Sequence, residues 1–153
     1  MKKFRYQMES LLQVKLKLEE QAKIAYGSAR LRLTNEQERL QELKLKKASY
    51  VQEERTLRTA RLDLVKIRHT AEAVEVMEQK IKQQMTVVNN AEQRLEVARI
   101  RLNNAMVERK TQEKLKEKAW QSYLLEFEAE ERKEVDELNS FQYSNPEQSE
   151  EDR

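Results

Sequence analysis

Apolar side chains recur with a seven-residue period through the middle of the chain, over residues 74–105. One position of the repeat holds long or branched apolar residues: Val74, Ile81, Val88, Leu95 and Leu102. The other holds mostly alanine: Met77, Gln84, Ala91, Ala98 and Ala105. Alternating steps of three and four place both sets on one stripe of a helix, which a second helix can bury. Five unbroken heptads predict a coiled coil, and the alanines favour one closely packed partner helix.

The first part of the chain repeats this pattern less regularly and predicts a helix over residues 5–57. Its apolar positions follow steps of three and four: Phe4, Met8, Leu11, Leu18, Ala22, Ala25, Ala29, Leu33, Leu40, Leu43, Tyr50 and Leu57. Two successive four-residue steps from Ala25 to Leu33 predict a stutter, which locally unwinds a supercoil. Polar residues at Lys15, Glu36, Lys47 and Glu54 make this half of the stripe weaker than the second.

Between residues 57 and 74 the stripe loses its phase, so we expect a hairpin turn within residues 58–70. The second helix is predicted over residues 71–140. Beyond residue 105 its stripe continues through Leu115, Ala119, Tyr123, Phe127, Val135 and Leu138. Polar and acidic residues predict a disordered tail over 141–153. The predicted fold is all-α: an antiparallel coiled-coil hairpin of two long helices over residues 1–140, followed by this tail.

The charge distribution supports the antiparallel arrangement. Residues 1–17 hold five basic and one acidic side chain, whereas residues 126–137 hold seven acidic and two basic side chains. A hairpin turn at 58–70 is expected to bring these opposite charges together. Because an exposed ion pair contributes only about 0–1 kcal/mol, such pairs select the orientation of the helices more than they stabilise them.

The composition excludes most other architectures. Charged and apolar residues each make up 38% of the 153 residues, with one Gly, one Pro and no Cys. So few turn-forming residues leave little room for a sheet, and the absence of cysteine excludes disulfides and thiolate metal sites. No apolar run approaches the roughly 20 residues of a membrane span, and the N-terminus does not read as a secretory signal.

Candidate catalytic chemistry is sparse, and we expect neither an enzyme nor a bound cofactor or metal. His69 is the only histidine, so it cannot anchor an ordinary transition-metal site and is expected to be a solvated turn residue. There is no glycine-rich phosphate loop and no nucleophile-elbow motif. Trp120, Tyr123 and Phe127 follow helical spacing, which indicates packing in the stripe; alternatively, Trp120 lies off it and anchors a partner.

The order of several short segments resembles the FliJ family, the small soluble component of the bacterial flagellar type III export apparatus. The first segment opens the chain: Lys3-Phe4-Arg5-Tyr6, then Ser10-Leu11-Leu12 and Lys15. The second leads into the small residues: Leu18-Glu19-Glu20-Gln21-Ala22. The third spans the end of the second helix: Glu113-Lys114-Leu115-Lys116-Glu117-Lys118, Tyr123, Glu130, Glu134, Val135, Asp136 and Glu137.

This resemblance implies a non-enzymatic stalk or adaptor for bacterial flagellum biogenesis, and hence for motility and chemotaxis. Such a protein promotes assembly and activity of the export ATPase ring, links the ring to the membrane export gate and escorts export chaperones. It implies a cytoplasmic location, peripheral to the inner face of the cell membrane at the flagellar base. No membrane span and no nucleic-acid partner are expected, and the chain alone is expected to be a monomer.

Two partner-binding regions follow from the resemblance. The end that faces the ATPase would include Phe4, Tyr6, Leu11, Leu12, Val135, Asp136 and Glu137. The face that contacts the gate would include Leu43, Tyr50, Met77 and Gln84. Near this face the chain departs from the family, because an aromatic residue of some relatives corresponds to about Ala73 here and a small residue to Lys80.

Two other functions remain open from the residues alone. The first is a generic homodimeric coiled coil that serves as a scaffold or spacer. The second is binding of nucleic acid, phospholipid or an acidic protein through the basic flank of the turn: Arg55, Arg58, Arg61, Lys66 and Arg68. No aromatic side chains interleave with these basic residues, which disfavours single-stranded nucleic acid.

Overall fold

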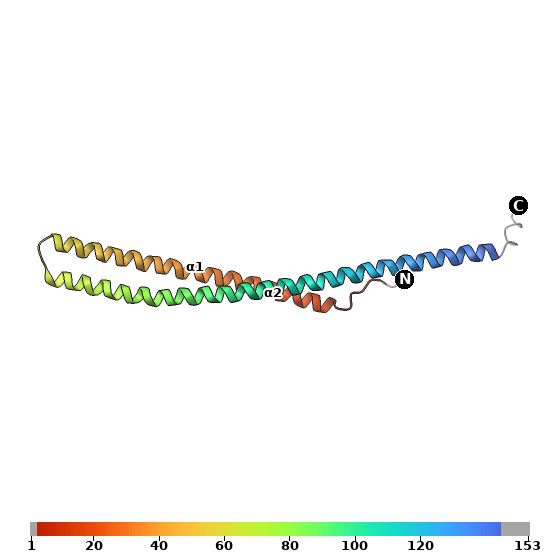
Figure 1. Cartoon of the computed structure of the whole chain (residues 1–153), viewed down its shortest axis with the longest axis horizontal. Helices are drawn as coiled ribbons and strands as arrows, with labels where there is room; N and C mark the ends of the chain where they lie inside the picture. The colour runs from red at the N-terminus through yellow and green to blue at the C-terminus, as the bar shows by residue number, and fades with distance from the viewer. Residues whose placement is uncertain (1–2, 145–153) are drawn as a thin grey trace. The chain divides into compact units, whose positions relative to one another are not determined.

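The computed structural model describes residues 3–144 and contains two helices. Helix α1 spans Glu9–Thr59 and α2 spans Leu64–Ser144. Figure 1 shows the yellow part of α1 and the green part of α2 side by side and antiparallel, joined by a short connection. The predicted all-α antiparallel hairpin is therefore confirmed. Within the described residues, neither helix carries an apolar stretch sufficient to cross a membrane.

The chain divides into two compact units, and each is described separately. The hairpin unit comprises residues 18–106, and the terminal unit comprises residues 1–17 with 107–153. The hairpin unit contains the turn and most of the seam, the name used here for the line of buried and half-buried residues between the helices. The terminal unit contains the start of α1 and the second half of α2.

The predicted heptads of α2 form its side of the seam in the hairpin unit. All ten residues of the repeat between Val74 and Ala105 are buried or half-buried. Met77, Val88 and Ala91 are the buried apolar residues among them. Burial of a valine or methionine side chain contributes about 1.5–3 kcal/mol. The small side chain of Ala91 lets the facing helix approach closely at that level.

The α1 side of the seam differs from the expected pattern at its beginning. Leu12 and Glu19 are buried, whereas the neighbouring Leu11 and Leu18 are exposed. Tyr26 is half-buried and Ala25 is exposed. From Glu19 onward the seam then follows regular steps of three and four through residues 22, 26, 29 and 33. The expected stutter is therefore absent, because the tyrosine ring occupies the position assigned to the alanine.

A polar pair interrupts the apolar seam of the hairpin unit. The Gln84 side chain donates hydrogen bonds from Nε2 to the backbone oxygen of Glu36, at 2.9 Å, and to its carboxylate, at 2.5 Å. Gln84 is buried. A buried polar group without a partner is costly, so this pair favours the one helix register in which both groups meet.

The connection between the helices comprises residues 60–63, which lie inside the interval 58–70 named from the sequence. The backbone nitrogen of Lys66 lies 3.4 Å from Oδ1 of Asp63. This is the geometry of an N-terminal helix cap, in which a carboxylate accepts from an otherwise unpaired backbone N–H. The cap explains why α2 begins at Leu64 and not at the expected residue 71.

The end of α2 also differs from the expectation. The helix continues to Ser144 and not to residue 140, so residues 141–144 of the expected disordered tail are helical. The Ser144 hydroxyl donates to the backbone oxygen of Ser140 at 2.8 Å, which satisfies one carbonyl of the last turn. Residues 145–153, the remainder of the expected tail, lie outside the described residues.

Candidate partner-binding surfaces

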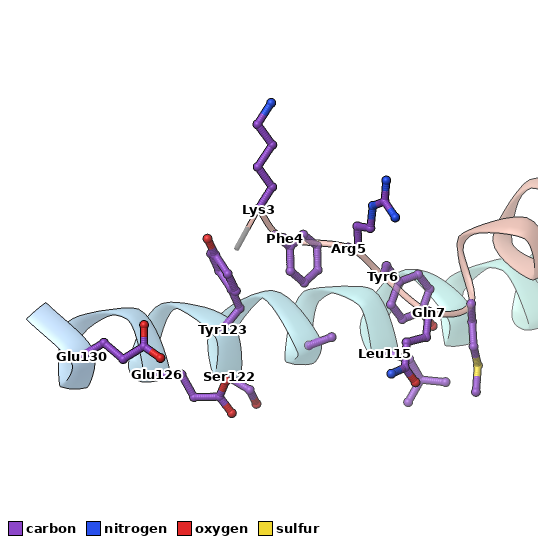
Figure 2. A pocket seen from close by; sticks show the side chains of 12 residues that line it. Lys3, Phe4, Arg5, Tyr6, Gln7, Leu115, Ser122, Tyr123, Glu126 and Glu130 are labelled. Atoms are coloured by element: carbon purple, nitrogen blue, oxygen red, sulfur yellow. The ribbon is translucent and has the colours of Figure 1, made fainter. Parts of the chain in front are cut away.

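Residues 3–6 are not helical, although the sequence suggested a helix from residue 5. Figure 2 shows this segment lying along α2, with Phe4 and Tyr6 directed toward the helix and Lys3 and Arg5 directed away. Side chains two residues apart point to the same side only in an extended chain. The extended conformation thus allows both rings to pack on α2, and α1 begins later, at Glu9.

Phe4 belongs to an aromatic cluster on α2. Its ring centroid lies 5.1 Å from that of Trp120, edge to face, and 5.4 Å from that of Tyr123. Trp120 also stacks on Tyr123 at 5.5 Å, and Tyr123 contacts Phe127 at 6.2 Å. Aromatic pairs in such arrangements contribute about 0.5–1.5 kcal/mol beyond the area they bury. Trp120 thus packs within the protein, yet 42% of its surface stays exposed and available to a partner.

The start of α1 is held to α2 by one buried leucine and several polar contacts. Leu12 is the buried apolar residue of this region. Lys15 pairs with Glu108 and Lys116 pairs with Glu9, both at 2.8 Å. The Tyr6 hydroxyl donates to Gln112 Oε1 at 3.1 Å. These ion pairs are partly exposed to solvent, with side chains 24–53% exposed, so they fix the register more than they add stability.

Glu9 makes polar contacts with side chains of both helices at the start of α1. Its carboxylate accepts hydrogen bonds from the side chains of Lys116 and Gln13, and these bonds hold the pKa of Glu9 below its ordinary value of 4.5. As the first residue of α1 it also lies where the helix dipole favours a negative charge. The contact between Glu9 and Lys116 is therefore complete above pH 4.5 and weakens as the pH falls through the lowered pKa.

The expected pairing of basic residues 1–17 with acidic residues 126–137 is largely absent. The ion pairs join α1 to Glu108 and Lys116 instead. Within residues 3–144, none of the acidic side chains of 126–137 forms an ion pair. Lys3 and Arg5 line the same open cavity of about 1220 Å³ as Glu126 and Glu130, without forming an ion pair with them. The predicted antiparallel orientation of the helices is correct, but the charged residues that pair between them differ from those expected.

The seven residues expected at the ATPase end fall into two groups. Phe4, Tyr6 and Leu12 pack against α2, while Leu11 is exposed beside them. Val135, Asp136 and Glu137 lie on the C-terminal extension, the name used here for residues 128–144, all of which are exposed. The heptad positions after Phe127 hold Glu130, Glu134 and Glu137. Because carboxylates replace apolar residues there, the seam cannot continue along the extension.

The four residues expected at the export gate all lie in the seam of the hairpin unit. Leu43 and Tyr50 are half-buried, and Met77 and Gln84 are buried. Their side chains hold the helices together, so Leu43 and Tyr50 are the ones that retain surface for a partner. Leu115, Val135 and Leu138, which the sequence placed on the stripe, are exposed instead.

Sequence reasoning missed Gln112 and Lys116 as members of the seam. Both are polar, so an apolar pattern does not select them, yet they occupy steps of three and four between Arg109 and Ala119. Extrapolating the heptads from residue 105 by spacing alone would have found them.

No metal centre or catalytic cluster emerges from the part of the chain that the structure describes. It holds no group of three or more His, Cys, Asp or Glu side chains placed to bind a metal ion. His69 is exposed on α2 near the turn. Two of the basic residues flanking the turn are engaged in ion pairs along their own helices, Arg58 with Glu54 and Arg68 with Glu72.

Comparison with known proteins agrees with this architecture. The structure of a YscO homologue, CT670, from Chlamydia trachomatis superposes with a TM-score of 0.78 and 26% sequence identity, over 95% of this chain and 99% of that chain. No curated protein matches the sequence significantly. Residues 4–148 match the family described as Flagellar FliJ protein. The resemblance seen in the sequence is thereby confirmed: the chain belongs to the FliJ family.

Proposed function

We propose that this chain is a stalk and adaptor of a flagellar or related type III export apparatus. It promotes assembly and activity of the export ATPase ring, links that ring to the membrane export gate and escorts export chaperones. The single observation that carries the proposal is the family match over residues 4–148. The antiparallel hairpin is consistent with it, because two long helices expose separate surfaces to different partners.

The ATPase-facing surface in this proposal is built on the terminal unit. The C-terminal extension exposes apolar side chains between its carboxylates, with Val135 at 55% and Leu138 at 64% exposure. Exposed apolar residues that lie next to one another and are rimmed by polar side chains mark a surface that a partner can cover. Phe4 and Trp120 pack together near the start of this extension. Aromatic residues often dominate the binding energy of protein interfaces.

Adding the chain to its cognate export ATPase is expected to raise ATP hydrolysis. The double variant Val135→Asp, Leu138→Asp should raise the concentration of chain needed for half-maximal stimulation by at least about 30-fold. This is the effect expected from the loss of one hot-spot residue. The matched control is Ile24→Asp, Leu31→Asp, which alters two equally exposed aliphatic residues of the hairpin unit. Equal stimulation by both variants would count against the assigned surface, and no stimulation by the native chain would overturn the proposal.

The gate-facing surface is placed on the hairpin unit around Leu43 and Tyr50. Met77 and Gln84 are assigned a supporting role, because their burial leaves little surface for direct contact. Gln84 holds the helix register through Glu36, and this fixes the position of the half-buried side chains beside it.

Substituting Tyr50 with alanine is expected to weaken binding to the cytoplasmic domain of the export gate by about tenfold or more. Tyr26→Ala is the matched control, because Tyr26 is also a half-buried tyrosine in the α1 seam. Both variants lose similar packing, so their unfolding temperatures should fall alike while only Tyr50→Ala affects affinity. Titration calorimetry would measure this, and equal affinities would remove Tyr50 from the gate surface.

Cellular location and chaperone escort follow from the same proposal. A chain that bridges an ATPase ring and a membrane gate must reside at the cytoplasmic side of the membrane, at the flagellar base. The competing idea of a parallel homodimeric scaffold is disfavoured, because the seams of α1 and α2 face each other within one chain.

A further inference from the structure

A groove of about 900 Å³ runs along one face of the hairpin unit and takes no part in the proposed ATPase and gate surfaces. Apolar side chains line it: Leu18, Ala22 and Ala25 of α1 and Val97 of α2. Leu18 and Val97 remain 43% and 48% exposed. Arg94 and Arg101 line the α2 side, and the lining residues include no acidic side chain. The groove thus combines apolar surface with positive charge.

The two arginines of the groove differ from Arg99 of the same helix, which is paired with an acidic residue. Arg99 donates two hydrogen bonds to Glu96, at 2.5 and 2.9 Å. Within residues 3–144, Arg94 and Arg101 form no ion pair. Guanidinium groups at the edge of an apolar groove are suited to carboxylates carried on an amphipathic helix.

The C-terminal extension has this complementary chemistry. Residues 130, 134, 137, 138 and 141 follow helical spacing and share one side of α2. They combine the apolar Leu138 and Phe141 with Glu130, Glu134 and Glu137. Glu130 and Glu137 are seven residues apart, as are Arg94 and Arg101, so both pairs span about 10 Å along a helix. The acidic residues of the extension lack ion pairs in the described chain.

We propose that the groove of one molecule binds the C-terminal extension of a second copy, with Glu130 and Glu137 facing Arg94 and Arg101. The same molecule cannot supply the extension, because α2 is one unbroken helix from Leu64 to Ser144. Residues 130–141 could reach residues 90–101 of their own helix only if that helix broke. The resulting self-association is reversible and dependent on salt, since exposed charges are screened. In the associated state, the groove covers Leu138 and Phe141 until another partner binds the extension.

Sedimentation velocity of the full chain, from micromolar to submillimolar concentration at low salt, tests this proposal. The native chain should associate with increasing concentration. The variants Arg94→Glu, Arg101→Glu and Glu130→Lys, Glu137→Lys should each weaken association at least about tenfold, because like charges then face each other. An equimolar mixture of the two variants should associate again, since the reversed groove then meets a reversed extension. The control Lys44→Glu, Lys46→Glu changes the net charge as much as the arginine variant, on exposed residues outside the groove.

Circular dichroism should show native helicity for all variants, because every substituted residue is exposed. A native chain that stays monomeric over the whole range overturns the proposal. So does association that the control weakens as much as the arginine variant, or a mixture of the two variants that fails to associate. The measurement uses the isolated chain, so its outcome is independent of whether the chain activates an export ATPase.

Discussion

Val88→Asp is expected to destabilise the hairpin unit by about 3–4 kcal/mol. Val88 is 7% exposed and lies in the middle of the seam. The substitution forfeits the burial of an aliphatic side chain, about 1.5–2 kcal/mol, and places a carboxylate in an apolar layer where it has no partner. Total stabilities of single domains are about 5–15 kcal/mol, so the loss is a large fraction of what holds the hairpin together.

Urea titration followed by helical circular dichroism would measure this loss. The matched control is Val76→Asp, because Val76 lies on the same helix but is 51% exposed. Its cost should stay within about 0.5 kcal/mol, as for most surface substitutions. If the two variants unfolded at the same urea concentration, Val88 would not lie between the helices and the assigned seam would be wrong.

Leu12→Ala is expected to cost about 2–3 kcal/mol, the lower part of the range for a buried leucine. Leu12 is 5% exposed and is the buried apolar residue that joins the start of α1 to α2 in the terminal unit. The surrounding contacts are exposed ion pairs and one hydrogen bond, which contribute little when the leucine is removed. The start of α1 should therefore open before the hairpin unit unfolds.

The emission of Trp120 reports this opening, because Phe4 packs on its ring and both would become more hydrated. Leu11→Ala is the control: the two leucines are adjacent, but Leu11 is 39% exposed. Hydrogen exchange should increase in residues 9–17 of the Leu12 variant and remain unchanged in residues 30–50. A uniform increase along the whole chain would contradict opening confined to the terminal unit.

The heptads of α2 were readable from the sequence because the apolar signal there is dense. Five consecutive repeats leave one stripe that can be buried, and the structure buries it. In α1 the signal is sparse, and two leucines stand side by side at residues 11 and 12. Either can begin a stripe, so the choice of Leu12 depends on the facing helix. The same ambiguity applies to Ala25 and Tyr26, because both follow acceptable helical spacing.

The sequence by itself determined the all-α class, the antiparallel hairpin and the family, because these depend on long-range periodicity and on the order of segments. Tertiary structure alone decided the extended conformation of residues 3–6, the pairing of Phe4 with Trp120, and the groove beside Arg94 and Arg101. Each of these brings together side chains from distant parts of the chain. Helical spacing fixes which residues share a face of one helix, whereas the register between two helices fixes which faces meet.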